Sequence, residues 1–164
     1  MLLGNEYALD CSSKKEIVSS ENKNRYILIN DAKAVIYQYR IDGNKAKDIP
    51  KPVYSSGTAG ERCDYTVEVV LEDSKSRLYI IELKGSDLIK AISQVKSTIN
   101  LFSSDKNVFR EFDAGLYEFY PRIVIHRVNT TALNSSETRK FKTQFPKYVV
   151  RRIKLEKSVT KPAR

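Results

Sequence analysis

The sequence predicts a single α/β domain over residues 1–164, with a mixed central β-sheet flanked by helices. Apolar runs of strand length, rich in Ile, Val and Tyr, follow one another in the first half of the chain. A polar turn at 73–76 joins two of these runs into a β-hairpin. In the second half, strand patterns alternate with helix patterns. Strands that alternate with helices after an antiparallel start are typical of a mixed sheet with helices packed on it.

The first elements precede the hairpin. Residues 26–30 and 34–41 are expected to be strands, and a short helix is expected over 13–20. Residues 44–60 form a loop rich in Pro, Gly and Ser. A loop of this length in a small domain is more often functional or mobile than inert.

The hairpin spans 64–84 and is followed by a helix over 86–102, for which Ser86 is a suitable N-cap. The apolar residues of this helix recur at helical spacing and form one stripe. They are Leu88, Ile92, Val95, Ile99 and Phe102.

Three elements follow this helix. A buried strand is expected over 120–128, and a second helix runs over 137–144 after the capping residues 134–136. Pro146 ends that helix, and a last strand is expected over 148–155. The elements therefore alternate in type to the end of the domain.

The composition bounds the class of protein. An apolar content of 41% and a charged content of 30% fit a soluble globular domain. No apolar stretch approaches the roughly 18 residues that span a membrane, and the first residues lack a signal-peptide pattern. Two cysteines provide no disulfide framework, and one histidine with two distant cysteines makes no obvious zinc site. We expect a cytoplasmic protein with no membrane partner.

The net charge of +9 is confined to one end of the chain. Residues 1–137 carry 19 basic and 19 acidic side chains, whereas 138–164 carry 10 basic and one acidic. A one-ended basic field suits a polyanion such as nucleic acid. The same pattern also fits a solvated helix and an edge strand protected by lysines, and charge alone leaves both open.

The second hairpin strand ends in charged residues. Period-two alternation places Glu82 and Lys84 on the same face as two apolar residues. An unpaired buried charge costs roughly several kcal/mol, so charges rarely end an apolar run without a reason. If the turn centres on Ser74, Asp64 lies opposite Lys84 and diagonal to Glu82 on this face. Two carboxylates beside a lysine predict a divalent-metal site.

An exposed strand can also carry such a pair as a surface ion pair worth at most about 1 kcal/mol. Three features favour a site instead. Asp64 stands 18 residues before Glu82, at the start of the partner strand. Gly85 and a helix follow the triplet at once, and Gln94 lies on the flank of that helix's apolar stripe.

With these residues the sequence resembles the PD-(D/E)xK nuclease superfamily, which includes restriction endonucleases, Holliday-junction resolvases and phage exonucleases. The matched elements are Asp64, the triplet Glu82-Leu83-Lys84 and Gln94, within residues 62–102. The segments ERCDYTV and YIIELKGSDLIKAISQ are similar to small bacterial and phage members. The resemblance implies a restriction-endonuclease-like core and Mg²⁺-dependent or Mn²⁺-dependent hydrolysis of phosphodiester bonds.

The resemblance also implies residue roles. Asp64 and Glu82 are expected to hold the metal, with the main-chain carbonyl of Leu83 as a further oxygen ligand. Lys84 is expected to orient or deprotonate the attacking water, or to stabilise developing charge. Gln94 is expected to steady the water or the lysine by hydrogen bonding.

The chain departs from the family pattern at two points. Cys63 replaces the proline that precedes the aspartate, and this position contributes no ligand. Many members carry another glutamate on an N-terminal helix, and Glu6, Glu16 and Glu21 are equal candidates for it. Glu61 is a fourth, which points elsewhere along the chain.

The expected partner is nucleic acid, DNA in the first place, and palindromic cutting or junction resolution would require a homodimer. The basic C-terminal segment is expected to contact phosphates. Its candidate residues are Arg139, Lys140, Lys142, Arg151, Arg152 and Lys154. The alternative function is a catalytically weak or inactive nuclease-fold module that binds nucleic acid or a protein partner.

Overall fold

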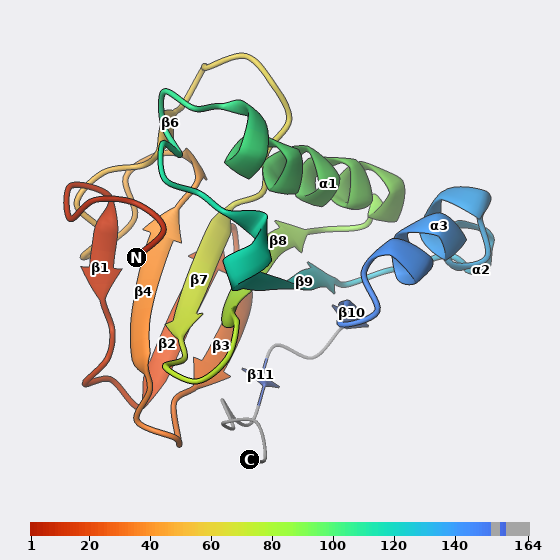
Figure 1. Ribbon diagram of the computed structural model, residues 1–164. Helices are drawn as coiled ribbons and strands as arrows, with labels where there is room; N and C mark the ends of the chain where they lie inside the picture. Colours follow the sequence, from red (N-terminus) through yellow and green to blue (C-terminus); the bar gives the residue numbers. More distant parts are fainter. Residues whose placement is uncertain (152–154, 157–164) are drawn as a thin grey trace.

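The computed structural model of the chain describes residues 1–151 and 155–156. A six-stranded sheet lies at its centre, in the order β1-β4-β7-β8-β9-β10 (Figure 1). Its strands are β1 (Ala8–Asp10), β4 (Val35–Arg40), β7 (Tyr65–Val70), β8 (Ser76–Lys84), β9 (Tyr117–Ile125) and β10 (Val149–Arg151).

Strand direction changes in the middle of this sheet. β1, β4, β7 and β8 pair antiparallel, whereas β8, β9 and β10 pair parallel. Parallel neighbours need a crossover connection. Helix α1 (Leu88–Ser104) connects β8 to β9, and α2 (Thr130–Leu133) with α3 (Ser136–Gln144) connects β9 to β10. The prediction of a mixed sheet flanked by helices is confirmed.

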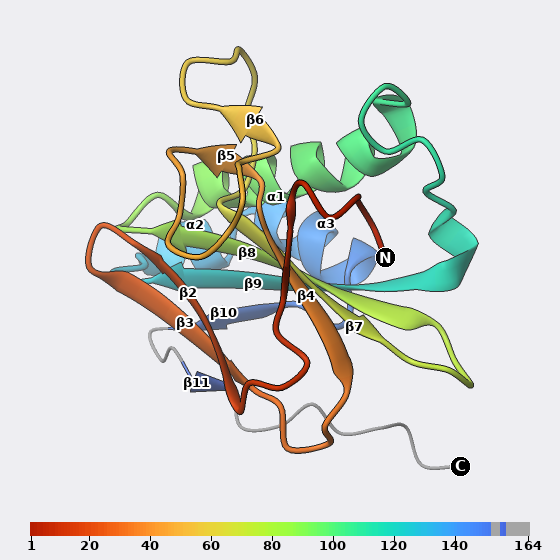
Figure 2. The ribbon, with the colours of Figure 1, turned by 90° about the vertical axis from the view of Figure 1, so that its left-hand side faces the viewer.

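Helices α1 and α3 pack on one face of the central sheet, and a second sheet covers the opposite face. It has the order β11-β3-β2, with β2 (Glu16–Glu21), β3 (Asn24–Ile29) and β11 (Leu155–Glu156) (Figure 2). Accordingly, the buried apolar residues form two clusters. One contains Val95 of α1 and Phe141 of α3, and the other contains Ile17 of β2 and Leu28 of β3. The central strands are therefore buried on both faces, which explains their long apolar runs.

The alternation predicted for β8 is confirmed by these two clusters. Leu78 and Ile80 belong to the cluster under α1. Tyr79, Ile81 and Leu83 belong to the cluster under the second sheet. Burial of each such side chain contributes roughly 1.5–3 kcal/mol, so the two layers fix the orientation of this strand.

Helix α1 has the predicted apolar stripe, and its five predicted residues are all buried. Its N-cap is Asp87 rather than Ser86, because the Asp87 side chain accepts a hydrogen bond from the backbone N–H of Lys90 at 2.9 Å. A carboxylate in this position also interacts favourably with the positive end of the helix dipole. The helix begins two residues later than predicted.

Two expectations about the edges of the domain are wrong. The helix expected over 13–20 is replaced by β2, which pairs antiparallel with β3 through the two-residue turn Asn22-Lys23. Along β2, Ile17 and Ser19 are buried while their neighbours are exposed, so tertiary pairing overrides the weak local preference. The single strand expected over 148–155 is divided into β10, on the central sheet, and β11, which pairs with β3.

The remaining elements are short. They are β5 (Asp42–Gly43), β6 (Tyr54–Ser55) and the 3₁₀ turn η1 (Ala114–Leu116). The strand expected over 120–128 is β9, which starts and ends three residues earlier. In the described part of the chain, no helix is both long enough and apolar enough to cross a membrane.

Candidate functional site

Asp64 lies where β7 begins, between β4 and β8. Its carbonyl oxygen accepts a hydrogen bond from Ile41 N–H at 2.9 Å, and its own N–H donates to the carbonyl of Ile81 at 3.2 Å. Its carboxylate Oδ2 accepts from Leu83 N–H at 2.8 Å. The Asp64 side chain therefore takes the place of a main-chain carbonyl as the acceptor for Leu83 N–H. This hydrogen bond holds the carboxylate where β7 and β8 meet.

The register of the hairpin differs from the predicted one by two residues. Tyr65 pairs with Ile81, which places Asp64 opposite Glu82 and not opposite Lys84. The difference arises because the turn centres one residue earlier than predicted. A shift of two residues leaves every side chain on its original face, so the prediction that the three charged residues share a face is kept.

Glu82 and Lys84 end β8 in different surroundings. The side chain of Glu82 is 2% exposed and that of Lys84 is 27% exposed, and Lys84 Nζ lies 4.0 Å from Glu82 Oε1. Glu82 Oε2 is buried and has no hydrogen-bond partner among the described residues. A buried carboxylate oxygen without a partner is costly, and it marks a position where a ligand would be favourable.

Burial changes the acidity of both carboxyl groups. Burial in the first place, and the nearby charge of Asp64 in the second, raise the pKa of Glu82 to about 9, while Lys84 opposes the rise. Burial also raises the pKa of Asp64 to about 6, against the Leu83 N–H and the Arg40 guanidinium, which lower it. A neighbouring carboxylate disfavours ionisation, as Asp64 does for Glu82. A cation between them would remove this penalty.

Arg40, which was not among the predicted site residues, joins this site from the second-sheet side. Its guanidinium lies 2.7 Å from Glu21 Oε2 and 4.0 Å from Asp64 Oδ1, and it stacks over the Tyr65 ring at 4.6 Å. Arg40 ends an apolar strand in the same way as Glu82 does. The rule that singled out Glu82 could therefore have singled out Arg40.

Of the three glutamates that were equal candidates, Glu21 is the one that reaches the site. It contacts Arg40, and its charge contributes to the raised pKa of Asp64. Glu16 is exposed at the opposite end of β2. Glu6 lines a separate pocket with residues 1–4, 7, 107–108 and 110–111. Glu21 lies at the end of strand β2, whereas the glutamate that the family pattern led us to expect lies on a helix.

Gln94 and Thr98 of α1 hold the segment that leads to Asp64. Gln94 Nε2 donates to the carbonyl of Arg62 at 3.0 Å. Thr98 Oγ1 accepts from the N–H of Cys63 at 2.8 Å and donates to the carbonyl of Gln94 at 2.9 Å. Gln94 thus positions the backbone before Asp64. The predicted contact of Gln94 with a water or a lysine stays a prediction, and its Oε1 is buried without a hydrogen-bond partner among the described residues.

Glu68 is a second buried carboxylate on the α1 face, and its environment is different. It accepts hydrogen bonds from the hydroxyls of Tyr39 at 2.8 Å and Tyr117 at 3.2 Å, and from Leu2 N–H at 2.6 Å. Both of its oxygens are therefore satisfied. Glu68 is a structural residue, whereas Glu82 retains an unsatisfied oxygen.

The carboxylates form a pair rather than a larger cluster. Within residues 1–151 and 155–156, no group of three or more His, Cys, Asp or Glu side chains is arranged to hold a metal ion. Mg²⁺ is often held by one or two carboxylates together with substrate phosphates and water, so Asp64 and Glu82 fit this ion. Leu83 supports Asp64 through its N–H, and a ligand role for its carbonyl stays a prediction.

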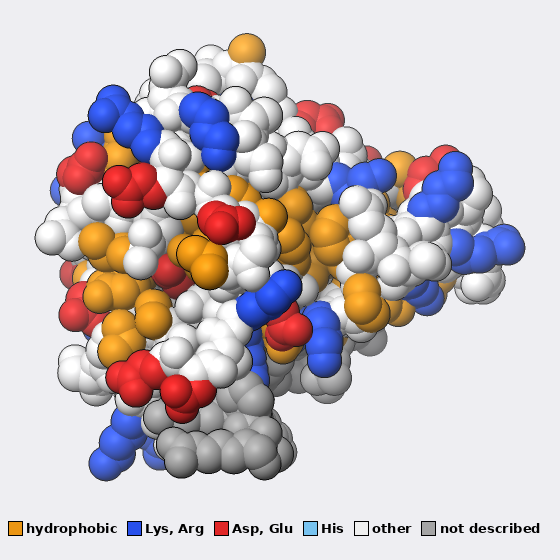
Figure 3. All heavy atoms as spheres, viewed as in Figure 1, with side chains coloured by type: hydrophobic (Ala, Val, Ile, Leu, Met, Phe, Trp, Pro, Cys, Tyr) orange, Lys and Arg blue, Asp and Glu red, His pale blue; other side chains and the backbone are white. Residues whose placement is uncertain are grey.

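The predicted phosphate contacts of the C-terminal segment lie partly on α3, where basic side chains gather (Figure 3). Arg139 donates to the carbonyl of Asn134 through Nη2 at 2.7 Å and through Nε at 3.1 Å. Lys142 Nζ lies 5.7 Å from the ring centre of Tyr148. Both therefore have partners within the protein. The side chains of Arg151, Arg152 and Lys154 lie outside the described residues.

The fold and the site together define a mixed α/β domain with a buried carboxylate pair at the end of its central strands. Comparisons of the chain with protein-family models, with curated proteins and with solved structures give no match.

Proposed function

We propose that this chain is a metal-dependent nuclease that hydrolyses the phosphodiester bonds of DNA. One observation carries the proposal: Asp64 and Glu82 share a site in which burial raises the pKa of both carboxyl groups and the charge of Asp64 adds to the rise at Glu82, with Lys84 Nζ 4.0 Å from Glu82 Oε1. Such an arrangement is unfavourable in the protein alone but suits a divalent cation and a phosphate. Perturbed carboxyl groups of this kind are candidates for functional residues.

Asp64 and Glu82 would hold Mg²⁺ or Mn²⁺, and the Leu83 carbonyl is proposed as a further ligand. The unpartnered Oε2 of Glu82 and the raised pKa of both carboxyl groups support this assignment. When bound, such a cation lowers the pKa of attached water and neutralises charge on the phosphate.

The other residues of the site act on the water, the phosphate or the carboxylates. Lys84 is proposed to orient or deprotonate the attacking water, or to stabilise the charge that develops on the phosphate. Arg40 is proposed to hold Asp64 and Glu21 in place by its contacts at 4.0 and 2.7 Å. Gln94 acts as a positioning residue through the carbonyl of Arg62.

The order of elements supports the proposal as well. The β7–β8 hairpin is followed by α1 and by the parallel strand β9. The resemblance in sequence covers the hairpin and this helix. We therefore propose that β4, β7, β8, α1 and β9 form a restriction-endonuclease-like core.

The test is cleavage of linear, circular and branched DNA with Mg²⁺ or Mn²⁺, in the presence and absence of EDTA. Cleavage is expected to require metal and to be lost in Glu82→Gln and Lys84→Ala. Glu61→Gln is the matched control, because Glu61 is exposed and contacts the Ser93 hydroxyl at 2.6 Å. Metal-independent cleavage, or cleavage that survives Glu82→Gln, would rule the proposed site out. Molecular mass measured with and without DNA tests the proposed homodimer.

The alternative is a nuclease-fold module that binds nucleic acid or a protein without cutting. The observation that favours it is that Asp64 Oδ2 is already engaged by Leu83 N–H. Calorimetric titration with Mn²⁺ separates the two functions. Tight DNA or protein binding without any Mn²⁺ binding would support the module and contradict the nuclease.

A further inference from the structure

A polar pocket of about 430 Å³ adjoins the site on the second-sheet side. It lies between the β2–β3 turn and the 44–47 segment, which are neighbours in the fold (Figure 2). Arg40 and Tyr65 belong to its lining. The Arg40 guanidinium also lies 4.0 Å from Asp64 Oδ1, so Arg40 connects the pocket to the carboxylate site.

The lining of this pocket is strongly basic. Glu21 is the single acidic residue among the described residues of the lining, and its carboxylate is paired with Arg40 at 2.7 Å. Asn22, Asn24 and Asn44 add amide groups that can donate hydrogen bonds. Five cationic side chains line the pocket: Lys23, Arg25, Arg40, Lys45 and Lys47. This combination suits a phosphate-bearing polyanion.

Arg40 has unused hydrogen-bonding capacity in this pocket. Its side chain is 4% exposed, and its Nε and Nη1 have no hydrogen-bond partner among the described residues. A buried guanidinium normally has its N–H groups satisfied. An anion in the pocket would supply the missing acceptors.

The β2–β3 turn places a lysine over the pocket at a conformational cost. Asn22 and Lys23 both have positive φ, of 44° and 69°. A two-residue turn of this kind favours glycine at its second position, because a side chain is disfavoured in the left-handed region. Lys23 occupies that position and lines the pocket. Retention of strain at such a residue suggests a function.

We propose that this pocket binds phosphates of a nucleic-acid backbone and leads the strand toward Asp64 and Glu82. The inference rests on the proposed nuclease function and assigns its substrate-binding surface. It differs from the sequence prediction, which assigned this role to the C-terminal segment. Two of the pocket's cationic residues precede β4 in the chain, Arg40 is the last residue of β4, and the other two follow it, so the fold brings them together.

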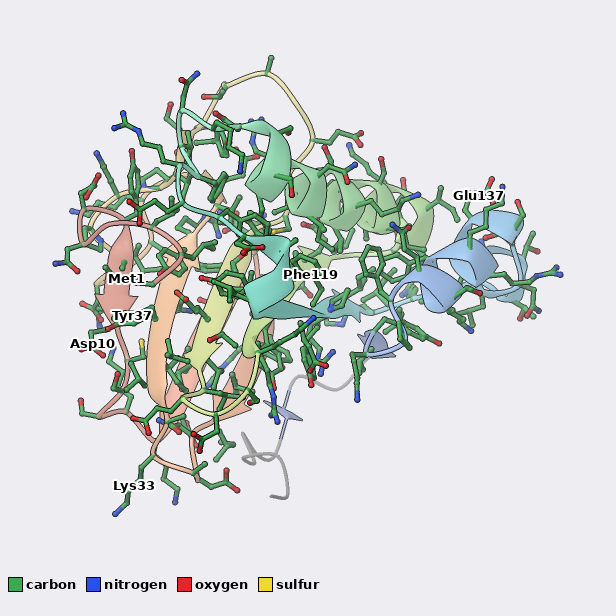
Figure 4. The ribbon with its side chains drawn as sticks, in the orientation of Figure 1. Met1, Asp10, Lys33, Tyr37, Phe119 and Glu137 are labelled. Carbon is green, nitrogen blue, oxygen red and sulfur yellow. The ribbon has the colours of Figure 1, made fainter. Side chains whose placement is uncertain are left out.

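The test is fluorescence anisotropy with labelled single-stranded and duplex DNA over a range of salt concentrations, in EDTA so that the DNA is not cut. The first variant is Lys23→Gly. Its matched control is Lys33→Gly, because Lys33 also has a positive φ, of 49°, and lies outside the pocket in the turn between β3 and β4 (Figure 4). Each change removes one positive charge and relieves one strained residue.

Both variants are expected to melt at a higher temperature than the natural chain, because glycine relieves the strain of a positive φ. A melting temperature that is not lowered shows that a change in DNA binding does not come from misfolding. Only Lys23→Gly is expected to weaken DNA binding and to reduce the slope of log affinity against log salt by about one. Equal affinities and slopes for the two variants would overturn the inference.

A second comparison removes two charges at each of two surfaces. Lys45→Gln with Lys47→Gln is expected to reduce the salt slope by about two, whereas Arg139→Gln with Lys142→Gln leaves it nearly unchanged. The reverse result assigns binding to α3 and refutes the pocket. Inorganic phosphate is then added as a competitor. If it displaces the DNA no more than its ionic strength accounts for, the result supports a site for the nucleic-acid backbone. Saturable displacement of the DNA at low phosphate concentration contradicts such a site.

The inference and the proposed function can fail separately. DNA binding that depends on Lys23, without metal-dependent cleavage, supports the pocket and refutes the nuclease. Metal-dependent cleavage by the natural chain, together with normal DNA binding by the pocket variants, supports the nuclease and refutes the pocket. A natural chain that does not bind DNA refutes the inference.

Discussion

The N–H of Leu83 donates a hydrogen bond to the carboxylate of Asp64 at 2.8 Å, across the point where β7 and β8 meet. The main chain of one strand thereby fixes a charged side chain of the other. This contact makes the carboxylate a part of the sheet as well as a part of the candidate site. Changes at Asp64 should therefore separate the two roles.

Asp64→Asn keeps an oxygen that accepts from Leu83 N–H, whereas Asp64→Ala leaves this N–H without its partner. We expect Asp64→Ala to lower the free energy of unfolding by about 1–3 kcal/mol, the usual cost of an unsatisfied buried group. Asp64→Asn should unfold nearly as the natural chain does. Urea denaturation measures both, and equal destabilisation by the two changes would contradict a structural role for the contact.

Glu82 should make stability depend on pH. Its pKa is about 9 in the folded chain against 4.5 for an ordinary glutamate, so the folded state holds a proton that the unfolded state has lost. Stability is thus fully present below about pH 4.5 and is lost as the pH rises through about 9. Glu82→Gln should flatten this decline. Thermal melting over this pH range tests the prediction, and an unchanged slope would show that Glu82 ionises normally.

Metal binding should show the opposite dependence on pH. Mn²⁺ requires ionised carboxylates, and the pKa values of about 6 and about 9 place their ionisation in the neutral to alkaline range. We expect Mn²⁺ at about 100 times its dissociation constant to stabilise the fold by about 2.7 kcal/mol. Calorimetry should record proton release on binding. Glu82→Gln should abolish the stabilisation, and Glu68→Gln, at the satisfied carboxylate, should leave it in place.

Thr98 should be required for the support of Asp64. Its hydroxyl accepts from Cys63 N–H at 2.8 Å and donates to the Gln94 carbonyl at 2.9 Å. The Thr98 side chain is buried. Thr98→Val has the same shape without the acceptor, and we expect a loss of about 1–3 kcal/mol. Thr98→Ser keeps the hydroxyl and should recover most of it. If Thr98→Val and Thr98→Ser unfold at the same urea concentration, the hydrogen bond is not the reason for the threonine.

Several features of the fold follow from local sequence alone. The apolar stripe of α1 predicted its buried face, and the alternation of β8 predicted which side chains face each layer. These patterns are readable because side-chain direction repeats every 3.6 residues in a helix and every two in a strand. The shared face of Asp64, Glu82 and Lys84 follows from the same rule.

The register of the hairpin did not follow, because the polar turn between β7 and β8 allows more than one centre. Packing on two faces selects among registers that differ by two residues, and local pattern cannot distinguish them. The segment 13–20 was misread for a related reason. Its pairing with β3 stabilises a strand that its own sequence does not strongly favour.

The sequence by itself determined the class of the domain, its main helix, the orientation of its central strands and the charged residues that end β8. Tertiary structure alone decided that Glu21 and Arg40 reach Asp64, and that cations from the β2–β3 turn and the 44–47 segment line one pocket. The physical reason is the range of the forces involved. Periodicity and capping act within a few residues, whereas the meeting of distant charged groups depends on how whole strands and sheets pack.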